Sequence, residues 1–340
     1  MVAVAALVFG SVAPGAWAQP QTAELRGNRW IEVPAPSSSP ATDAATDREL
    51  AQVEQLVAQR RHGQARARLV RWFKRHGPTA PARDRALYLM AQAQFQKGDR
   101  IKSFYYLDQL LDEYPDSALF FPALEMQFRI ADAYLDGHKN RFLGMPIVEA
   151  YDEAVDMLYR IQSRAPGSQI AERALLRTAD HYYASADYDL ASDAYAAFSR
   201  SYPRSPATPR VRLRQAFANY AQFRGLRFDA TPLVDARAQL SEIVAQHPEL
   251  AQEEGLPEVI ERIDRTFAEK LYVTADFYRR TSEPRAAAYT YKQLISAYPD
   301  TPEAQKAQQA LARLPESARR SAGVEPPTTK PARASMSSSR

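Results

Sequence analysis

Residues 179–205 read ADHYYASADYDLASDAYAAFSRSYPRS and contain two amphipathic helices, a turn and a terminator in one unit. The turn at Ser185–Asp187 separates the two helices. The second helix presents Ala191, Tyr195 and Phe198 on one face, and Pro203 ends it because proline cannot continue a helix. The first helix has an apolar face formed by Leu175, Thr178, Ala179 and Tyr182. The segment therefore predicts a helical hairpin in which small residues allow the two helices to approach closely.

The hairpin's pattern of one small residue, two apolar residues and a proline recurs six times along the chain. The closest copies, which begin at Ala154 and Ala191, are separated by slightly more than the roughly 34 residues of a tetratricopeptide repeat. We therefore predict an all-α fold, a tetratricopeptide-type helical-hairpin solenoid of about six repeats. The six copies are Ser103, Leu107, Leu110 and Pro115; Ala154, Leu158, Ile161 and Pro166; Ala191, Tyr195, Phe198 and Pro203; Ala236, Leu240, Ile243 and Pro248; Ala287, Tyr291, Leu294 and Pro299; and a weaker copy of Ala65, Leu69, Trp72 and Pro78.

The two ends of the chain differ from this array in composition. Residues 2–13 are almost wholly apolar and Ala16-Trp17-Ala18 precedes Gln19, which predicts a signal peptide over 1–18 and export to the periplasm. A start further upstream and an unstructured leader are the alternatives. Residues 19–46 and 315–340 are rich in Pro, Ser, Ala and Thr, so we expect a disordered linker and a disordered tail around a solenoid spanning 47–314. The apolar island Trp30–Val33 is interpreted as an unstructured contact, with a docked strand as the alternative.

The charge is nearly balanced, with 44 basic and 40 acidic residues and a net charge of +4. This balance gives no indication of nucleic-acid binding. Only the first predicted hairpin is crowded with basic residues, namely Arg60, Arg61, Arg66, Arg68, Arg71, Lys74 and Arg75. A solvated end of the array is the simpler interpretation, and contact with a partner or with acidic lipid is the alternative.

The sequence contains no pattern of catalytic or metal-binding residues. Its five histidines are scattered, it has no cysteine, and no Gly-rich phosphate loop occurs in it. We therefore expect neither an enzyme nor a cofactor, a metal or a small-molecule substrate. The function should lie in the recognition of proteins.

The first helix of each tetratricopeptide hairpin presents one face to the concave side of the array. The residues predicted there combine aromatic rings with acids and amides; they are Tyr88, Gln92, Phe95, Phe128, Asp132, Leu176, Asp180 and Tyr183. Such a surface suits an extended peptide with bulky side chains. Arg85 precedes Tyr88 on the same helix and is a candidate to receive a peptide carboxylate. For each aromatic residue, packing against the next hairpin is the alternative.

Two insertions interrupt the array, at 136–149 and at 223–232, and both join the two helices of one hairpin. Each insertion carries aromatic residues beside basic ones, so Arg141, Phe142, Arg227 and Phe228 are candidates for contact with a partner. A tolerated surface insertion is the alternative, since closing a longer loop costs little.

The chain from about Arg48 to Leu311 resembles the BamD family, a subunit of the bacterial β-barrel assembly machinery. The likeness is carried by AEKLYVTADFYRRTSEPRAAAYTYKQLISAYPDTPEAQKA at 268–307 and by RGLRFDATPLVDARAQLSEIVAQHP at 224–248. The resemblance implies a non-catalytic scaffold that helps to insert outer-membrane proteins. Tyr272 and Asp276, which fall on the predicted concave face of the sixth hairpin, are further partner-contact candidates. Two departures are the six hairpins, where the family usually has five, and the absence of the cysteine that carries the family's lipid anchor.

Two functions are therefore open. The first is a BamD-like periplasmic scaffold that binds unfolded β-barrel clients, a barrel-assembly partner or both, and that meets the outer membrane only peripherally through a partner. The second is a general periplasmic tetratricopeptide adaptor for peptidoglycan or constriction machinery of the cell envelope. Co-purification of a barrel partner would favour the first, and co-purification of cell-wall enzymes the second.

Overall fold

The computed structural model describes residues 22–26, 29–33, 44–136, 141–142, 145–146 and 151–321. It forms two compact units, residues 1–178 and residues 179–340. The division falls inside helix α7 (Gln169–Ala184).

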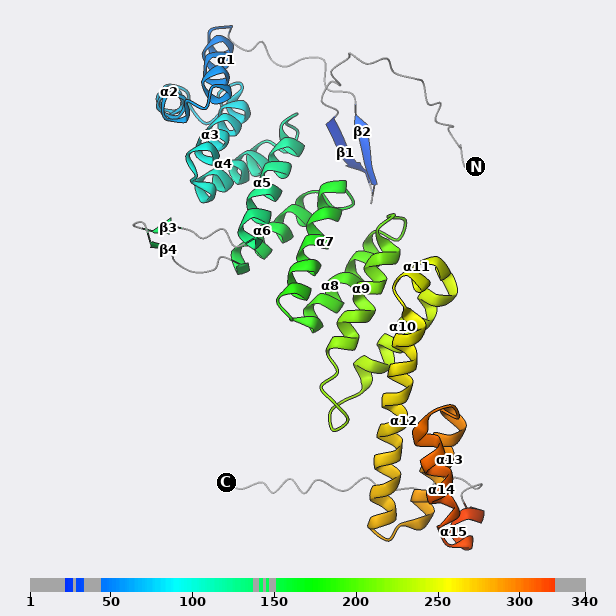
Figure 1. The fold of residues 1–340 in the computed structure, drawn as a ribbon. Helices are drawn as coiled ribbons and strands as arrows, with labels where there is room; N and C mark the ends of the chain where they lie inside the picture. Colours follow the sequence, from blue (N-terminus) through cyan, green and yellow to red (C-terminus); the bar gives the residue numbers. More distant parts are fainter. Residues whose placement is uncertain are drawn as a thin grey trace, which may run out of the picture. The chain divides into compact units, whose positions relative to one another are not determined.

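Helical hairpins build the first unit (Figure 1). Its helices are α1 (Ala44–Ala58), α2 (His62–Arg75), α3 (Arg83–Lys97), α4 (Arg100–Glu113), α5 (Phe120–Leu135) and α6 (Tyr151–Arg164), followed by the first part of α7. Each helix from α1 to α5 packs against the next one along the chain, and α1 also packs against α3. The three hairpins therefore have α1, α3 and α5 as their first helices.

Small residues lie where the helices of a hairpin approach most closely. Ala91 of α3 and Ser103 of α4 are fully buried, and the Ser103 hydroxyl donates a hydrogen bond to the Ala91 carbonyl at 2.8 Å. In the first hairpin Leu69 and Trp72 are fully buried in the core. Burial of each such side chain stabilises the fold by on the order of 2 kcal/mol.

The second unit continues the same arrangement. After the end of α7 it contains α8 (Tyr188–Ser201), α9 (Thr208–Ala221), α10 (Thr231–Gln246), α11 (Pro248–Glu253), α12 (Leu256–Arg280), α13 (Pro284–Ala297), α14 (Pro302–Ala312) and α15 (Glu316–Ser321). Helix α9 packs against both α8 and α10, and α12 packs against α13. Helices α14 and α15 pack on α13 and cover the core of the last hairpin.

The structure confirms the predicted helical-hairpin solenoid of about six repeats. Every small and apolar residue of the six predicted copies is buried. The proline that closes each copy lies outside a helix or at a helix start, as its missing N–H requires. Helix α11 lies between the fifth and sixth hairpins and belongs to no copy of the pattern.

Short strands occur at the apolar island Trp30–Val33 and just before it, where a strand was only the alternative interpretation. Strand β1 (Thr22–Arg26) pairs antiparallel with β2 (Arg29–Val33), with Leu25 opposite Trp30. This pairing corrects the expectation of an unstructured linker at these residues. The missed signal is the Gly-Asn pair between the two strands in the sequence, because that pair is typical of two-residue hairpin turns.

The boundaries of the solenoid also differ from the expectation. Helix α1 begins within the predicted linker, and α15 lies within the predicted tail. The predicted signal peptide and the end of the tail lie outside the described residues. Among the residues that the structure does describe, no helix has the length and apolar character needed to span a membrane.

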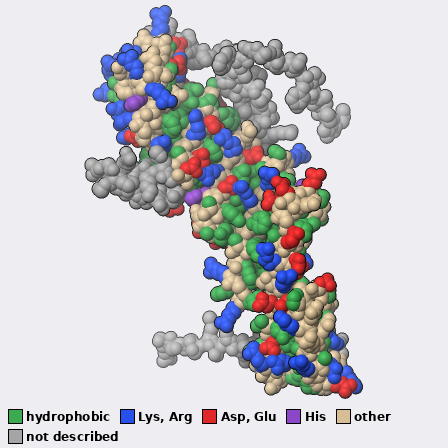
Figure 2. Space-filling view, in the orientation of Figure 1, with side chains coloured by type: hydrophobic (Ala, Val, Ile, Leu, Met, Phe, Trp, Pro, Cys, Tyr) green, Lys and Arg blue, Asp and Glu red, His purple; other side chains and the backbone are tan. Residues whose placement is uncertain are grey.

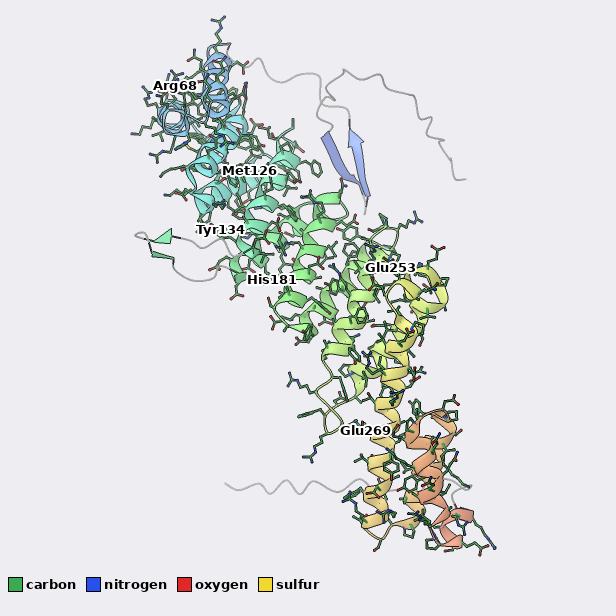
Figure 3. The ribbon with its side chains drawn as sticks, in the orientation of Figure 1. Arg68, Met126, Tyr134, His181, Glu253 and Glu269 are labelled. Carbon is green, nitrogen blue, oxygen red and sulfur yellow. The ribbon has the colours of Figure 1, made fainter. Side chains whose placement is uncertain are left out.

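Basic side chains gather around α1 and α2 (Figure 2). Arg66, Arg71 and Lys74 of the predicted basic cluster are exposed. Arg68, labelled in Figure 3, donates a hydrogen bond to Gln52 of α1 at 2.9 Å, and Arg75 pairs with Glu49. Two members of the cluster therefore link α2 to α1, while the others face solvent.

Candidate functional site

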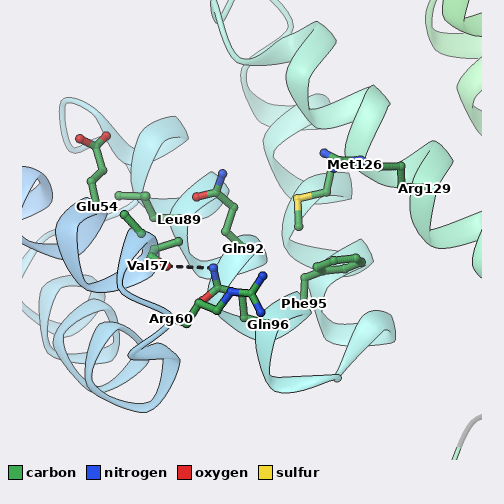
Figure 4. A pocket seen from close by; sticks show the side chains of 10 residues that line it. Glu54, Val57, Arg60, Leu89, Gln92, Phe95, Gln96, Met126 and Arg129 are labelled. Carbon is green, nitrogen blue, oxygen red and sulfur yellow. Dashed lines mark hydrogen bonds between the residues drawn. The ribbon is translucent and has the colours of Figure 1, made fainter.

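A pocket of about 390 Å³ lies between the first helices α1, α3 and α5 of the three hairpins in the first unit (Figure 4). The buried face of α3 carries Leu87, Met90 and Ala91. Gln92, Phe95 and Gln96 therefore fall on other sides of the helix and reach the pocket. The residues lining it are Glu54, Val57, Ala58, Arg60, Leu89, Gln92, Phe95, Gln96, Met126 and Arg129.

The floor of the pocket is apolar and is buried by the surrounding side chains. Val57, Leu89 and Met126 are each less than one-tenth exposed, and Phe95 is half-buried beside them. The Gln96 side-chain amide donates a hydrogen bond to the Val57 carbonyl at 2.9 Å. This bond ties α3 to the last turn of α1, so most of the pocket's lining lies on helices, while Arg60 lies in the turn that follows α1.

Two guanidinium groups at the pocket lack a carboxylate partner. Arg60 and Arg129 are exposed, and neither forms an ion pair with any residue that the structure describes. The carboxylate of Glu54, which also lines the pocket, is already engaged because Arg85 donates to it at 2.7 Å. The pocket therefore combines an apolar floor with two cationic groups that are open to an anion.

Arg85, the predicted carboxylate receptor, is held in a network of its own. It pairs with Glu54 and, at 3.4 Å, with Asp47. The hydrogen bond that Arg85 donates to Glu54 is the main cause that raises the pKa of the Arg85 guanidinium. Because two carboxylates of α1 already satisfy Arg85, Arg60 and Arg129 are better placed to receive an external carboxylate.

The other predicted groove residues of the first unit differ in their surroundings. Gln92 and Phe95 line the pocket, and Tyr88 is half-buried on α3 without lining it. Phe128 is buried, with the Arg173 guanidinium 4.4 Å from its ring centroid. Asp132 pairs with Arg177. Phe128 and Asp132 thus serve the packing of α5 against α7.

Helix α7 carries the remaining three predicted groove residues. Leu176 is half-buried. In the second unit, Asp180 accepts a hydrogen bond from the Tyr195 hydroxyl at 2.7 Å and also pairs with Arg214. The Tyr183 ring packs against Tyr195, with a centroid distance of 6.4 Å. Asp180 is therefore engaged by Tyr195 and Arg214 within the fold. Burial is the main cause that raises the pKa of the Tyr195 phenol.

Several residues of the pocket are not predicted by the repeat positions, among them Val57, Arg60, Met126 and Arg129. The first copy of the pattern begins at Ala65, so the helix before it has no predicted concave face. The apolar spacing of Leu50, Val53 and Val57 is the signal that identifies α1 as a first helix. Met126 and Arg129 lie on the side of α5 turned toward α3, whereas the predicted residues of α5 lie on a neighbouring side.

Within the described ranges, no group of three or more His, Asp or Glu side chains is arranged to hold a metal ion.

A family model described as "outer membrane lipoprotein", YfiO, matches residues 148–328, which is more than half of the chain. The chain belongs to the YfiO family. A tetratricopeptide repeat model matches residues 85–117, which hold most of α3 and all of α4. These two matches confirm the BamD-like resemblance and the tetratricopeptide class. No curated protein matches the chain.

Solved tetratricopeptide structures are similar to this YfiO-family chain at low identity. One is the C-terminal part of a TPR repeat-containing protein from Cytophaga hutchinsonii, at 12% identity and a TM-score of 0.37, covering 76% of this chain and 86% of that one. Another is a thermophilic TPR protein of Thermus thermophilus, at 18% identity and a TM-score of 0.28, covering 64% of this chain and 97% of that one.

The region matched by the YfiO model includes the insertion at 223–232. Phe228 is 58% exposed, and Arg224 and Arg227 are exposed beside it. The loop is held in place, because the Lys270 ammonium of α12 donates to the Phe228 carbonyl at 3.0 Å. A pocket of about 580 Å³ lies beside this loop, lined in part by Tyr188, Arg224 and Phe228.

The other partner-contact candidates of this YfiO-family chain are less available. Tyr272 packs against Tyr291, with ring centroids 5.8 Å apart. Asp276 pairs with Arg279 and Arg280 on its own helix. Arg141 and Phe142 form strand β3 (Arg141–Phe142), which pairs with β4 (Met145–Pro146). For these two residues the structure describes the backbone alone.

Proposed function

We propose that this YfiO-family chain is a non-catalytic periplasmic scaffold that binds unfolded outer-membrane β-barrel clients through the pocket between α1, α3 and α5. The observation that carries the proposal is the pair Arg60 and Arg129, two guanidinium groups without a described carboxylate partner beside an apolar floor. The apolar segment 2–13 and the cleavage-like Ala16-Trp17-Ala18 support export.

The chemistry of the pocket favours a peptide that ends in an aromatic residue. A guanidinium group recognises a carboxylate through two parallel hydrogen bonds, and these strengthen when water is partly excluded. A ring next to the carboxylate would pack against Phe95 and the Met126 thioether, contacts that each contribute about 0.5–1.5 kcal/mol. The polar Gln92 at the edge can bond to the backbone of the peptide.

The test is a titration of a fluorescein-labelled peptide that carries the C-terminal sequence of a β-barrel protein ending in Phe. Wild-type protein should bind it. The Arg60→Ala, Arg129→Ala double variant and Phe95→Ala should each weaken binding about tenfold, since losing roughly 1.4 kcal/mol corresponds to that factor. Tyr88→Ala should have a smaller effect, because Tyr88 does not line the pocket.

Amidation of the peptide's C-terminus separates carboxylate capture from aromatic packing. Amidation should weaken binding to the wild type but should have no further effect on the arginine double variant, because both changes remove the same interaction. Arg210→Ala, an exposed arginine of α9, is the matched control. Equal affinities of both peptides for all of these proteins would contradict the proposal. Co-purification of cell-wall enzymes without any barrel protein would favour the envelope-adaptor function instead.

A further inference from the structure

A second cleft of the first unit lies between the second helices α4 and α6 and shares no lining residue with the pocket described above. Its volume is about 280 Å³. The buried rings of Phe104 and of Tyr134, which is labelled in Figure 3, form its floor. We name it the α4–α6 cleft.

The rim of the α4–α6 cleft exposes large apolar side chains. Ile101 and Tyr105 lie one turn apart on α4 and are 36% and 64% exposed, and Met157 of α6 is half-buried opposite them. Tyr105 has the largest exposed fraction of any large hydrophobic side chain in the part of the chain that the structure describes. An apolar side chain entering the cleft would cover Ile101, Tyr105 and Met157 from water.

The charges around the cleft are negative and open. Glu153 and Asp156 line it from α6, and neither pairs with a cation among the described residues. Arg160, the cation that lines the cleft, is already paired with Asp108 of α4 at 2.8 Å. Lys102, beside Ile101 on α4, is likewise paired with Asp99 at 2.9 Å. The cleft therefore presents two free carboxylates next to an exposed tyrosine ring.

We propose that the α4–α6 cleft is a docking site for a basic segment of a partner protein. An apolar side chain of the segment packs between Ile101, Tyr105 and Met157. A neighbouring Arg or Lys pairs with Glu153 and Asp156 and lies against the face of Tyr105, which attracts cations. This site goes beyond the proposed function, because its charge is opposite to that of the pocket between α1, α3 and α5 and it selects a different ligand.

The experiment measures binding of the fluorescein-labelled hexapeptide Arg-Leu-Trp-Arg-Leu-Arg to the full chain by fluorescence anisotropy. Wild-type protein should bind this peptide and should bind Glu-Leu-Trp-Glu-Leu-Glu at least roughly tenfold more weakly, because like charges repel. The Glu153→Gln, Asp156→Asn double variant and Tyr105→Ala should each weaken binding of the basic peptide roughly fivefold. Added salt should reduce the effect of the carboxylate variant, since ions screen exposed charges.

Matched variants control for nonspecific attraction. Tyr159→Ala removes an exposed tyrosine that lies on α6 and does not line the cleft. The Asp193→Asn, Asp235→Asn double variant removes two exposed carboxylates of the second unit. Neither control should change the affinity. The proposal is overturned if the two peptides bind equally well, or if the controls weaken binding as much as the cleft variants do. It is also overturned if a peptide with the sequence of 322–340 binds more tightly than the basic hexapeptide. That last result would assign the cleft to the chain's own tail.

Discussion

At the scale of the residue, Arg60 combines backbone strain with a position at the candidate pocket. Its φ of 57° lies in the left-handed region, which costs a residue with a Cβ about 1 kcal/mol. The backbone N–H of Arg61 donates to the Leu56 carbonyl, and that of Arg60 donates to the Val57 carbonyl. This is the Schellman pattern of a helix C-terminus, in which glycine is the usual residue at the position of Arg60. The second hairpin has Gly98 at this position, with φ 91°.

Replacing Arg60 with glycine should therefore stabilise the fold while removing a pocket cation. We expect Arg60→Gly to raise the free energy of unfolding by up to about 1 kcal/mol, because glycine adopts this conformation without strain. Urea denaturation followed by circular dichroism measures the change. Ser282→Gly, at a φ of 62° in the turn after α12, should give a similar gain. If both variants are less stable than the wild type, these turns are not strained.

At the scale of the element, the insertion between α9 and α10 is an ordered loop. The Asp229 carboxylate accepts hydrogen bonds from the backbone N–H and the hydroxyl of Thr231, at 3.0 and 2.8 Å. The first of these bonds is the main cause that lowers the pKa of Asp229. Together with the bond from Lys270 to the Phe228 carbonyl, they hold the loop while the Phe228 ring stays exposed.

Removing the Asp229 carboxylate should loosen this loop and leave the helices intact. In limited proteolysis we expect trypsin to cleave Asp229→Ala after Arg224 or Arg227 several-fold faster than it cleaves the wild type, because local opening limits such cleavage. Mass spectrometry of the fragments identifies the site. Asp193→Ala, a change at an exposed aspartate of α8, should leave the rate unchanged. Equal rates for Asp229→Ala and wild type would show that these hydrogen bonds do not order the loop.

At the scale of the whole molecule, buried tyrosines are distributed over both units. Tyr134 lies in the first unit, and Tyr195 and Tyr291 lie in the second; each is at most 2% exposed. Burial is the largest cause that raises the pKa of all three phenols above the ordinary value of 10.0. A raised folded-state pKa means that the folded chain keeps these protons at a pH where the unfolded chain loses them.

These three phenols should therefore leave the free energy of unfolding unchanged below about pH 10. Above about pH 10 they should lower it as the pH rises. Circular dichroism at neutral pH should be dominated by helix, well above the roughly one-third of an average globular protein. Between about pH 10 and 12 the helical signal should be lost together with a rise of tyrosinate absorbance. Titration of all tyrosines near pH 10 with the helical signal intact would contradict this prediction.

The sequence by itself determined the solenoid, because its pattern of small residues, apolar residues and prolines is set by the packing inside one hairpin. Ala191, Tyr195 and Phe198 are buried for reasons that act over a few residues of one helix. The same local logic placed Gln92 and Phe95 on one side of α3, and both of them line the pocket.

Only the tertiary structure decided which charged groups are free. Arg85 is satisfied by Glu54 and Asp47 on another helix, whereas Arg60 and Arg129 come from distant segments to one pocket. Ion pairing depends on distances between side chains that are far apart in the sequence, and no periodicity encodes those distances. The sequence therefore determines which guanidinium and carboxylate groups the chain has. The packing of the helices determines which of these groups are available to a ligand.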